Sequence, residues 1–369
     1  MRILFGMPSP ESLGGPIFCE PPFVQAVRDA GIDADEEVYT YGEGLTPTPL
    51  WGRVSRVIGA AYRLRRRTRK AKYDIIHLNT SIDEKCVLRD LVTFVFLRSS
   101  GVPVYLKMQG SIAPFLKTKS RFWQMLMHLV FSQAAGIGVL SSEERENFLA
   151  AGCPPEKLSV AKYVIDSEIY TCEDDFRSRY GVVHDVPVLL FSSRFVPTKG
   201  LLDVITACGK LKSDGRKVVL FCLGDGPVRV EAERLVAHLG LEREVLFFGY
   251  IPEAETAAFH ANSTIFVFPT YHDEGFPLVI LKSLAAGLPI ITTQIRAAAD
   301  YLSEPENCLW VSPRSAAELA ERIARLLDDN TLRETMSSNN RRLAEQFNAD
   351  NVVKHYLSVY EEIIGSRKK

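Results

Sequence analysis

The stretch "IFVFPTYHDEGFPLVILKSLAAGLPIITT", residues 265–293, contains a complete strand, turn, helix and second strand. The apolar run "IFVFPT" predicts a buried strand, "YHDEGF" a turn, "PLVILKSLAAG" a helix and "PIITT" another strand. Pro277 falls near the first turn of this helix, where a missing N–H costs nothing. The stretch therefore predicts one unit of a parallel sheet, with the carboxylate of Glu274 on the turn after the first strand.

The same alternation runs from end to end of the chain. Apolar runs such as "RILFGM", "YDIIHLN", "PVYLKMQG", "PVLLFSS" and "VVLFCLG" are separated by helical patterns. Continuous apolar strands that alternate with helices are typical of parallel sheets covered on both faces. A length of 369 residues suits two domains of roughly 150 residues each. The sequence thus predicts an α/β fold with two doubly wound domains.

Domain boundaries follow from local composition. Residues 1–166 and 187–345 carry the strand and helix patterns, whereas 167–186 are polar, acidic and poor in strand signal, so we expect a linker there. Residues 346–369 predict an amphipathic C-terminal helix that needs a surface to cover, and the first domain is one candidate.

Composition excludes several classes of protein. The formal net charge is −1, so no global charge steers the chain toward nucleic acid or a membrane. The 7 cysteines are scattered without a C-x-x-C pair, which fits a reducing compartment. The chain opens without a signal-peptide pattern, and its apolar runs are shorter than the ~20 residues of a membrane span. We expect a cytoplasmic protein.

Two doubly wound domains are expected to face each other across a cleft at the carboxyl ends of their strands. In the first domain, Gly14 and Gly15 precede a helix whose free N–H groups could meet a phosphate or sugar; a plain flexible turn is the alternative. In the second, Arg194 and Lys199 in "SSRFVPTKG" follow a strand, so two cations and a helix start converge on one anion site. A solvated basic loop is the other interpretation.

Three further loops follow strands of the second domain. Gly224 and Gly226 in "LGDGPVRVEAERL" allow a tight turn and suggest that this loop shapes the cleft. Tyr250 and Ile251 in "FFGYIP" suit contact with a planar base or, equally, packing. Glu274 is expected to point into the cleft, with surface capping as the alternative.

These motifs, in this order, resemble the retaining GT-B glycosyltransferases of family four: "SRFVPTKG", "GDGPVRVEAERL", "VLFFGYIP" and "EGFPLVILKSLAAGLPII". The resemblance is strongest from about residue 187 to 293. It implies a nucleotide-diphosphate sugar in the second domain, an acceptor held by the first, and neither a metal nor another cofactor. The residues that it assigns to the donor and its transfer are Gly14, Gly15, Gln109, Arg194, Lys199, Tyr250, Ile251, Glu274, Gly275, Phe276, Leu278 and Lys282.

Within that resemblance, Arg194 and Lys199 hold the diphosphate, Tyr250 and Ile251 the base, and Glu274 the sugar hydroxyls. The chain departs from the family at three places. Lys282 stands where the family has a second glutamate that accepts the ribose hydroxyls, and an ammonium can only donate. Gln109 replaces a frequent histidine near the sugar. Tyr163 and Val164 replace a frequent Asn-Gly pair near the hinge.

The leading functional hypothesis is transfer of a sugar, with retention, from a nucleotide-diphosphate donor to a hydroxyl of a glycan or lipid-linked acceptor. A nucleotide-sugar epimerase of the same architecture and a degenerate protein that only binds a donor are the alternatives. A metal-dependent transferase of the other major glycosyltransferase fold would rest on "DAD" at 33–35, a pattern that recurs by chance in a chain with 45 acidic residues.

The segment "WGRVSRVIGAAYRLRRRTRKAK", residues 51–72, holds nine Arg or Lys and no acid. On a helix, Trp51, Val54, Val57, Ile58 and Ala61 share one face and most of the cations share the opposite one, as in an ordinary helix packed on the sheet. The concentrated charge equally predicts reversible attachment to an anionic membrane surface. Nucleic acid is not expected, because no aromatic platform is interleaved with the cations.

Overall fold

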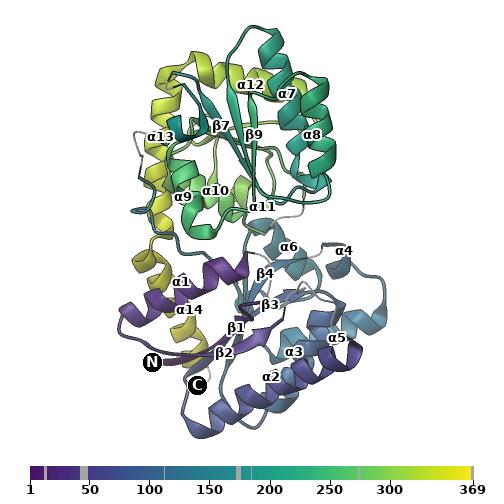
Figure 1. Ribbon diagram of the computed structural model, residues 1–369. Coiled ribbons are helices and arrows are strands. Elements are labelled where there is room, and N and C mark those ends of the chain that lie inside the picture. Colours follow the sequence, from purple (N-terminus) through teal and green to yellow (C-terminus); the bar gives the residue numbers. More distant parts are fainter. Residues whose placement is uncertain are drawn as a thin grey trace. The chain divides into compact units, whose positions relative to one another are not determined.

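The computed structural model describes residues 1–11, 15–41, 49–111, 113–171, 176–183, 185–272 and 275–366. The chain forms two compact units (Figure 1). Unit 1 comprises Met1–Val164 and Ala349–Lys369, and unit 2 comprises Ile165–Asn348. The segment 167–186, expected to be a linker, is assigned to unit 2, and the C-terminal helix is assigned to unit 1.

Unit 1 is built on a parallel six-stranded sheet in the order β2-β1-β3-β4-β5-β6. Its elements are β1 (Arg2–Pro8), α1 (Pro16–Asp29), β2 (Asp33–Thr40), α2 (Leu50–Lys70), β3 (Ile75–Ile82), α3 (Glu84–Leu97), β4 (Val104–Ser111), α4 (Ala113–Leu116), α5 (Arg121–Gln133), β5 (Gly136–Val139), α6 (Ser142–Ala150), η1 (Pro155–Lys157), β6 (Leu158–Val160) and α14 (Ala349–Ser366).

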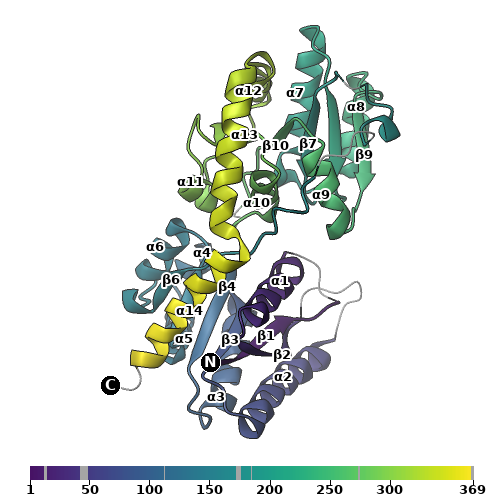
Figure 2. The ribbon, with the colours of Figure 1, turned by 90° about the vertical axis from the view of Figure 1, so that its left-hand side faces the viewer.

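Alternation along the strands of unit 1 supplies two buried faces. Leu4, Ile76 and Leu106 join one core cluster with residues of α2, α3 and α5. On the opposite face, His77 packs against Phe23 of α1 and Tyr356 of α14. Helices α1 and α14 are in contact with each other (Figure 2). The C-terminal helix therefore completes the core of unit 1.

Unit 2 holds a second parallel six-stranded sheet, in the order β12-β11-β10-β7-β8-β9. Its elements are η2 (Ser178–Tyr180), β7 (Val188–Ser192), η3 (Pro197–Lys199), α7 (Leu201–Ser213), β8 (Val219–Leu223), α8 (Arg229–His238), β9 (Val245–Gly249), α9 (Glu253–Ala261), β10 (Ile265–Phe268), α10 (Leu278–Ala285), β11 (Ile290–Thr292), α11 (Arg296–Tyr301), β12 (Cys308–Trp310), α12 (Ala316–Asp328), α13 (Asn330–Ala344) and η4 (Glu345–Phe347).

The strand order of unit 2 is that of the Rossmann fold. The chain adds β8 and β9 on one side of β7 and then β10, β11 and β12 on the other side, so the order of strand addition reverses between β7 and β10. In such sheets ligands bind at this switch point, outside the carboxyl ends of the strands. Helix α7 packs against α8 and α12, and α10 packs against α9 and α13. Two doubly wound α/β units are thus confirmed, and the loops after β7 and β10 become the first place to look for a site.

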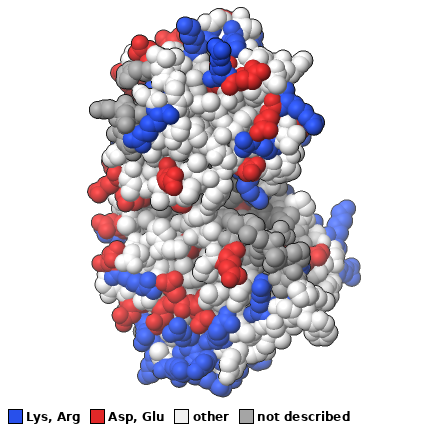
Figure 3. All heavy atoms as spheres, in the orientation of Figure 1, with Lys and Arg blue, Asp and Glu red and all other residues white. Residues whose placement is uncertain are grey.

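Helix α2 forms over the basic segment, but its exposed face differs from the expectation. The buried side chains are Ala60, Ala61 and Leu64, whereas Trp51 is 84% exposed and Ile58 46% exposed. Small alanines allow the helix to lie close to the sheet, and this contact turns the larger apolar residues outward. Lys and Arg side chains gather over α2 at the lower end of the view in Figure 3. Within the described residues, no helix is both long and apolar enough to cross a bilayer.

Candidate active site

The first feature of unit 2 is the short helix η3, which follows β7 and carries Lys199. Its backbone is tied to the segment after β10: the amide of Tyr271 donates to Thr198 O at 2.8 Å, and the Tyr271 hydroxyl donates to Pro197 O at 2.6 Å. The Thr198 hydroxyl lies 3.1 Å from His272 Nδ1. Hydrogen bonds therefore hold η3 against the turn that leads to Glu274, which itself lies outside the described residues.

Gly200 makes this contact possible. Its φ of 81° lies in the left-handed region, and a Cβ added there would sit 2.7 Å from the carbonyl oxygen of Pro269. Only glycine can adopt this φ and also fit this close to Pro269 without strain. The loop after β7 can therefore lie directly on the loop after β10.

Lys199 is buried at the switch point, with 6% of its surface exposed. Its ammonium lies over the ring of Phe268, 5.6 Å from the centroid. Burial, together with the positive charge of Arg194, lowers the pKa of Lys199 to about 7. Arg194 itself is exposed. Two cations that share one strand end and repel each other favour an anionic ligand, because its charge would relieve both effects.

The glycine loop after β8 supports this strand end. A Cβ on Gly224 would fall 1.8 Å from Ser193 O, and one on Gly226 would fall 2.5 Å from Phe195 O. The amide of Phe195 donates to Asp225 O at 2.8 Å. The two glycines therefore let the loop pack on the backbone beside Arg194, a supporting role rather than a chemical one.

The turn after β10 enters α10 through Gly275 and Phe276. Phe276 is buried and stacks on Tyr301, with 5.2 Å between ring centroids. Its side chain anchors the turn to the core, so only its backbone can meet a ligand. Leu278 is half-buried and begins α10, whose first amides have no partner within the helix, although that of Ile280 already donates to Pro277 O at 3.0 Å. These amides are donors suited to a phosphate or a sugar.

The segment after β9 offers an exposed aromatic. Tyr250 is 69% exposed and Ile251 is half-buried. This exposure argues against the packing interpretation, since packing would bury the ring, and contact with a base stays a prediction. Glu253 follows two residues later as the first residue of α9.

Lys282 lies on α10 with only 7% of its surface exposed. Its Nζ lies 2.6 Å from Glu253 Oε1 and donates to Thr256 Oγ1 at 3.2 Å. The sequence did not single out Glu253, because nothing in the order of residues shows which carboxylate meets a lysine 29 positions away. The family comparison at Lys282 was the signal that could have prompted a search for one.

In unit 1, Gly15 precedes Pro16, the first residue of α1. Gly14 lies outside the described residues. Gln109 is on β4, and its amide nitrogen donates to Glu20 Oε1 at 2.7 Å and to Asn79 Oδ1 at 2.8 Å. Its carbonyl oxygen accepts from the Tyr163 hydroxyl at 2.9 Å. Both amide hydrogens are thus engaged, so Gln109 can offer a sugar only its carbonyl oxygen.

Sequence inspection missed the buried ion pair beneath Gln109. Lys107 Nζ lies 2.7 Å from Glu20 Oε1, and neither side chain is exposed. The ammonium also lies 4.8–5.5 Å from the ring centroids of Phe23, Tyr163 and Tyr356. A lysine in the middle of the apolar strand "VYLKMQ" was the available signal, because such a position is normally buried.

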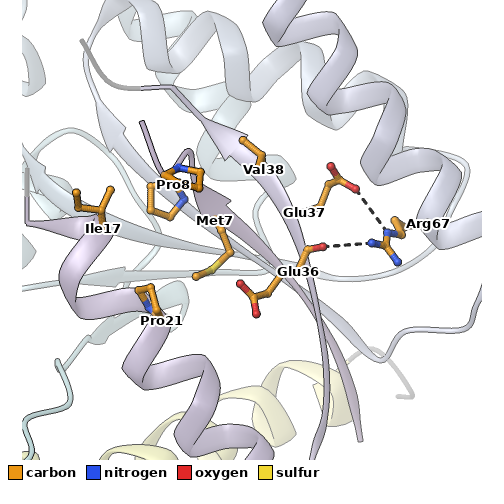
Figure 4. Close-up of a pocket in the computed structure, with 9 residues that line it drawn as sticks. Met7, Pro8, Ile17, Pro21, Glu36, Glu37, Val38 and Arg67 are labelled. Carbon is orange, nitrogen blue, oxygen red and sulfur yellow. Dashed lines mark hydrogen bonds and ion pairs between the residues drawn. The ribbon is translucent and has the colours of Figure 1, made fainter. Parts of the chain in front are cut away.

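Unit 1 also holds a recess of about 440 Å³. It is lined by Met7, Pro8, Pro10, Ile17, Pro21, Glu36, Glu37, Val38 and Arg67. Figure 4 shows Arg67 reaching the Glu37 carboxylate and the Glu36 carbonyl at its edge. None of the residues expected to bind the donor lines this recess.

The "DAD" pattern lies within β2. Asp35 accepts hydrogen bonds from Arg2 and from the Tyr73 hydroxyl, both at 2.8 Å. The carboxylate therefore has structural partners in unit 1. Over the described ranges, no group of three or more His, Cys, Asp or Glu side chains is arranged to hold a metal ion.

The two Rossmann-like units, one with a basic, glycine-supported strand edge, define an α/β protein of the GT-B fold class. Family models match in both units: "Glycosyl transferases group 1" over residues 173–343 and "Glycosyl transferase 4-like domain" over residues 20–163. The chain therefore carries a group 1 glycosyltransferase domain in unit 2 and a glycosyltransferase 4-like domain in unit 1.

Individual relatives agree. The 2-deoxystreptamine glucosyltransferase of Streptomyces kanamyceticus is 27% identical over 244 residues, 64% of this chain and 62% of the relative. The lipopolysaccharide core biosynthesis glycosyltransferase LpsE of Rhizobium meliloti is 31% identical over 186 residues, 50% of this chain and 52% of LpsE. The chain thus matches about half to three-fifths of the length of these relatives.

Among solved structures, HepE of Anabaena in complex with UDP aligns with a TM-score of 0.80 and 20% identity. The alignment covers 98% of this chain and 100% of HepE. At this level of identity the likeness establishes the fold.

Proposed function

We propose that the protein is a retaining glycosyltransferase that moves a sugar from a nucleotide-diphosphate donor to a hydroxyl of a glycan or lipid-linked acceptor, without a required metal. The observation that carries the proposal is Lys199, a buried lysine beside Arg194 at the switch point of unit 2. Its pKa is lowered by burial and by Arg194, and a bound diphosphate would reverse both penalties.

The main chemical demand in such a transfer is stabilisation of the departing diphosphate. Charge on the leaving oxygens grows in the transition state, so fixed cations beside them act most strongly there. Arg194, Lys199 and the first amides of α10 would supply this stabilisation. The leaving phosphate itself would accept the proton of the acceptor hydroxyl, and we assign no protein base.

The donor side is tested by binding and by turnover. Isothermal titration with UDP, GDP and ADP, followed by turnover of the matching nucleotide sugars, identifies the donor. We expect Arg194→Ala and Lys199→Ala to lower turnover by about 10²–10³ each. Turnover within threefold of wild type for both variants would refute the assignment. Glu274→Gln is expected to impair transfer, with its larger effect on discrimination between sugars.

Two further measurements test the finer parts of the proposal. Turnover retained in a chelator supports a metal-independent reaction, whereas loss that is restored by a divalent cation would contradict it. The anomeric configuration of the first product, read by NMR, must match that of the donor for a retaining mechanism.

On the acceptor side, we propose that helix α2 brings unit 1 to an anionic membrane surface as a peripheral contact. An exposed apolar stripe on this helix supports the proposal: Leu50, Trp51, Val54, Ile58 and Tyr62 are between 45% and 84% exposed. Arg66 and Arg69 are also exposed on α2. An amphipathic helix with aromatic and basic residues on its outer face is suited to lie in a membrane interface. A lipid-linked acceptor would be reached from there.

A further inference from the structure

The ion pair between Lys282 and Glu253 has an asymmetric exposure. The Lys282 side chain is 8% exposed, whereas the Glu253 side chain is 40% exposed. The buried ammonium donates to Glu253 Oε1 and to Thr256 Oγ1. The pair therefore presents its carboxylate, rather than its ammonium, toward solvent.

The hydroxyl of Thr256 is already committed. It donates to the backbone oxygen of Glu253 at 2.8 Å while it accepts from Lys282. His260, one turn further along α9, donates from Nδ1 to Thr256 O at 2.9 Å. Burial, with a contribution from Lys282, lowers the pKa of His260 to about 3, so this ring is neutral near pH 7. The carboxylate of Glu253 is thus the counter-charge that Lys282 holds in this cluster.

The position of the carboxylate matters as much as its orientation. Glu253 begins α9, two residues after Ile251, in the segment that follows β9. Lys282 belongs to α10, which follows β10 and packs against α9. The pair therefore joins the segment with the exposed Tyr250 to the helix beside the switch point.

We propose that Glu253, held by Lys282, is the acceptor for the ribose hydroxyls of the nucleotide, and that the pair selects a 2′,3′-diol. The proposal rests on the proposed nucleotide-sugar donor. A carboxylate has two acceptor oxygens, and Oε2 remains in addition to the oxygen engaged by Lys282. Lys282 is a positioning residue: it fixes the carboxylate and compensates its charge.

An isolated buried ammonium is strongly unfavourable, so Lys282 requires a partner. Glu253 of the neighbouring helix α9 is that partner, and the ammonium in turn holds the carboxylate in one place. An ion pair that only ties α9 to α10 is the alternative, and it predicts no preference for ribose over deoxyribose.

The test is isothermal titration of the wild type with UDP, GDP and ADP and with their 2′-deoxy counterparts. We expect wild type to bind the preferred ribonucleotide about 10- to 100-fold more tightly than its 2′-deoxy form. Glu253→Gln should reduce this ratio toward one. Glu255→Gln, on the same helix but exposed, is the matched control and should leave the ratio unchanged.

Lys282 is tested separately from folding. We expect Lys282→Met to lower the ratio and Lys282→Arg to retain it, because an arginine can still hold the carboxylate. The exchanged pair, Lys282→Glu with Glu253→Lys, should recover the preference. Thermal melting of each variant separates loss of fold from loss of selectivity.

The outcomes separate the two proposals. If Lys199→Ala abolishes nucleotide binding while Glu253→Gln keeps the full ribose preference, the diol assignment is wrong and the donor site stands. If the wild type binds none of the six nucleotides, both proposals are wrong.

Discussion

Lys107 Nζ and Glu20 Oε1 lie 2.7 Å apart in unit 1, in a place where neither side chain is exposed. The pair joins β4 to α1 and lies among three aromatic rings, one of them from the C-terminal helix. Among the residues that the structure describes, none forms a hydrogen bond with Glu20 Oε2. The ion pair is therefore buried, and one of its carboxylate oxygens is unsatisfied among these residues. Burial of the two charges already costs free energy of desolvation, and removal of only one partner destabilises the protein further.

Removal of one member of this pair should destabilise the protein strongly. Lys107→Met leaves a buried carboxylate without its cation, and we expect a loss of about 3–5 kcal/mol in the free energy of unfolding. The double variant Lys107→Met with Glu20→Leu should recover most of it, because no charge is then buried. Urea denaturation of the single and double variants measures both. Lys210→Ala, which removes an exposed pair with Asp214, is the control and should change little. A single variant as stable as this control would contradict the prediction.

Nucleotide-diphosphate affinity should fall as pH rises through about 7. Burial and Arg194 lower the pKa of Lys199 to about 7, so its ammonium is present below that pH and is lost above it. Binding should therefore take up a proton, and between pH 7 and 9 the wild type should lose roughly tenfold or more in affinity. Lys199→Arg keeps its charge and serves as the reference for titration of the ligand itself. Parallel pH profiles for the two proteins would show that Lys199 does not titrate on binding.

Gly200→Ala should disrupt the donor edge of unit 2. Its φ of 81° and the 2.7 Å approach to Pro269 O make an added Cβ both strained and overlapping. Gly215 offers a matched control, since its φ is 77° but no atom lies within 4 Å of an added Cβ. We expect Gly215→Ala to cost about 1 kcal/mol and Gly200→Ala to cost more and to weaken nucleotide binding. Equal melting temperatures and affinities for the two variants would contradict this.

Attachment to anionic vesicles should depend on both the apolar and the basic residues of α2. Co-sedimentation with liposomes that contain anionic lipid should be salt-sensitive. It should weaken in the triple variant Arg65→Ser, Arg66→Ser and Arg69→Ser, because each cation near the surface contributes ~1 kcal/mol to membrane binding. Arg67 is left unchanged, because it pairs with Glu37 within unit 1. Trp51→Ala should weaken binding independently of salt. If the wild-type protein does not bind anionic vesicles, the membrane contact is refuted and a soluble acceptor is favoured.

The fold was within reach of the sequence because it depends on a pattern that repeats. Buried parallel strands must be apolar on both faces, and the helices between them must be amphipathic. Each strand and each helix can therefore be recognised from a short stretch of sequence. The strand ends with Arg194, Lys199 and Tyr250 could be located for the same reason. Parallel strands bring all their carboxyl ends to one edge, wherever those loops stand in the chain.

Side-chain partnerships were decided only by the tertiary structure. The sequence shows a lysine at 282 and another at 107, but it does not show that Glu253 and Glu20 meet them, since these contacts depend on how helices pack on a sheet. The exposed face of α2 was mispredicted for a related reason. A helical wheel separates apolar from basic residues, whereas contact with the sheet selected the small residues Ala60 and Ala61 and turned Trp51 outward. Local pattern therefore determined the elements and their order, and close packing, which depends on size and on distant partners, determined which charges meet and which surface is left open.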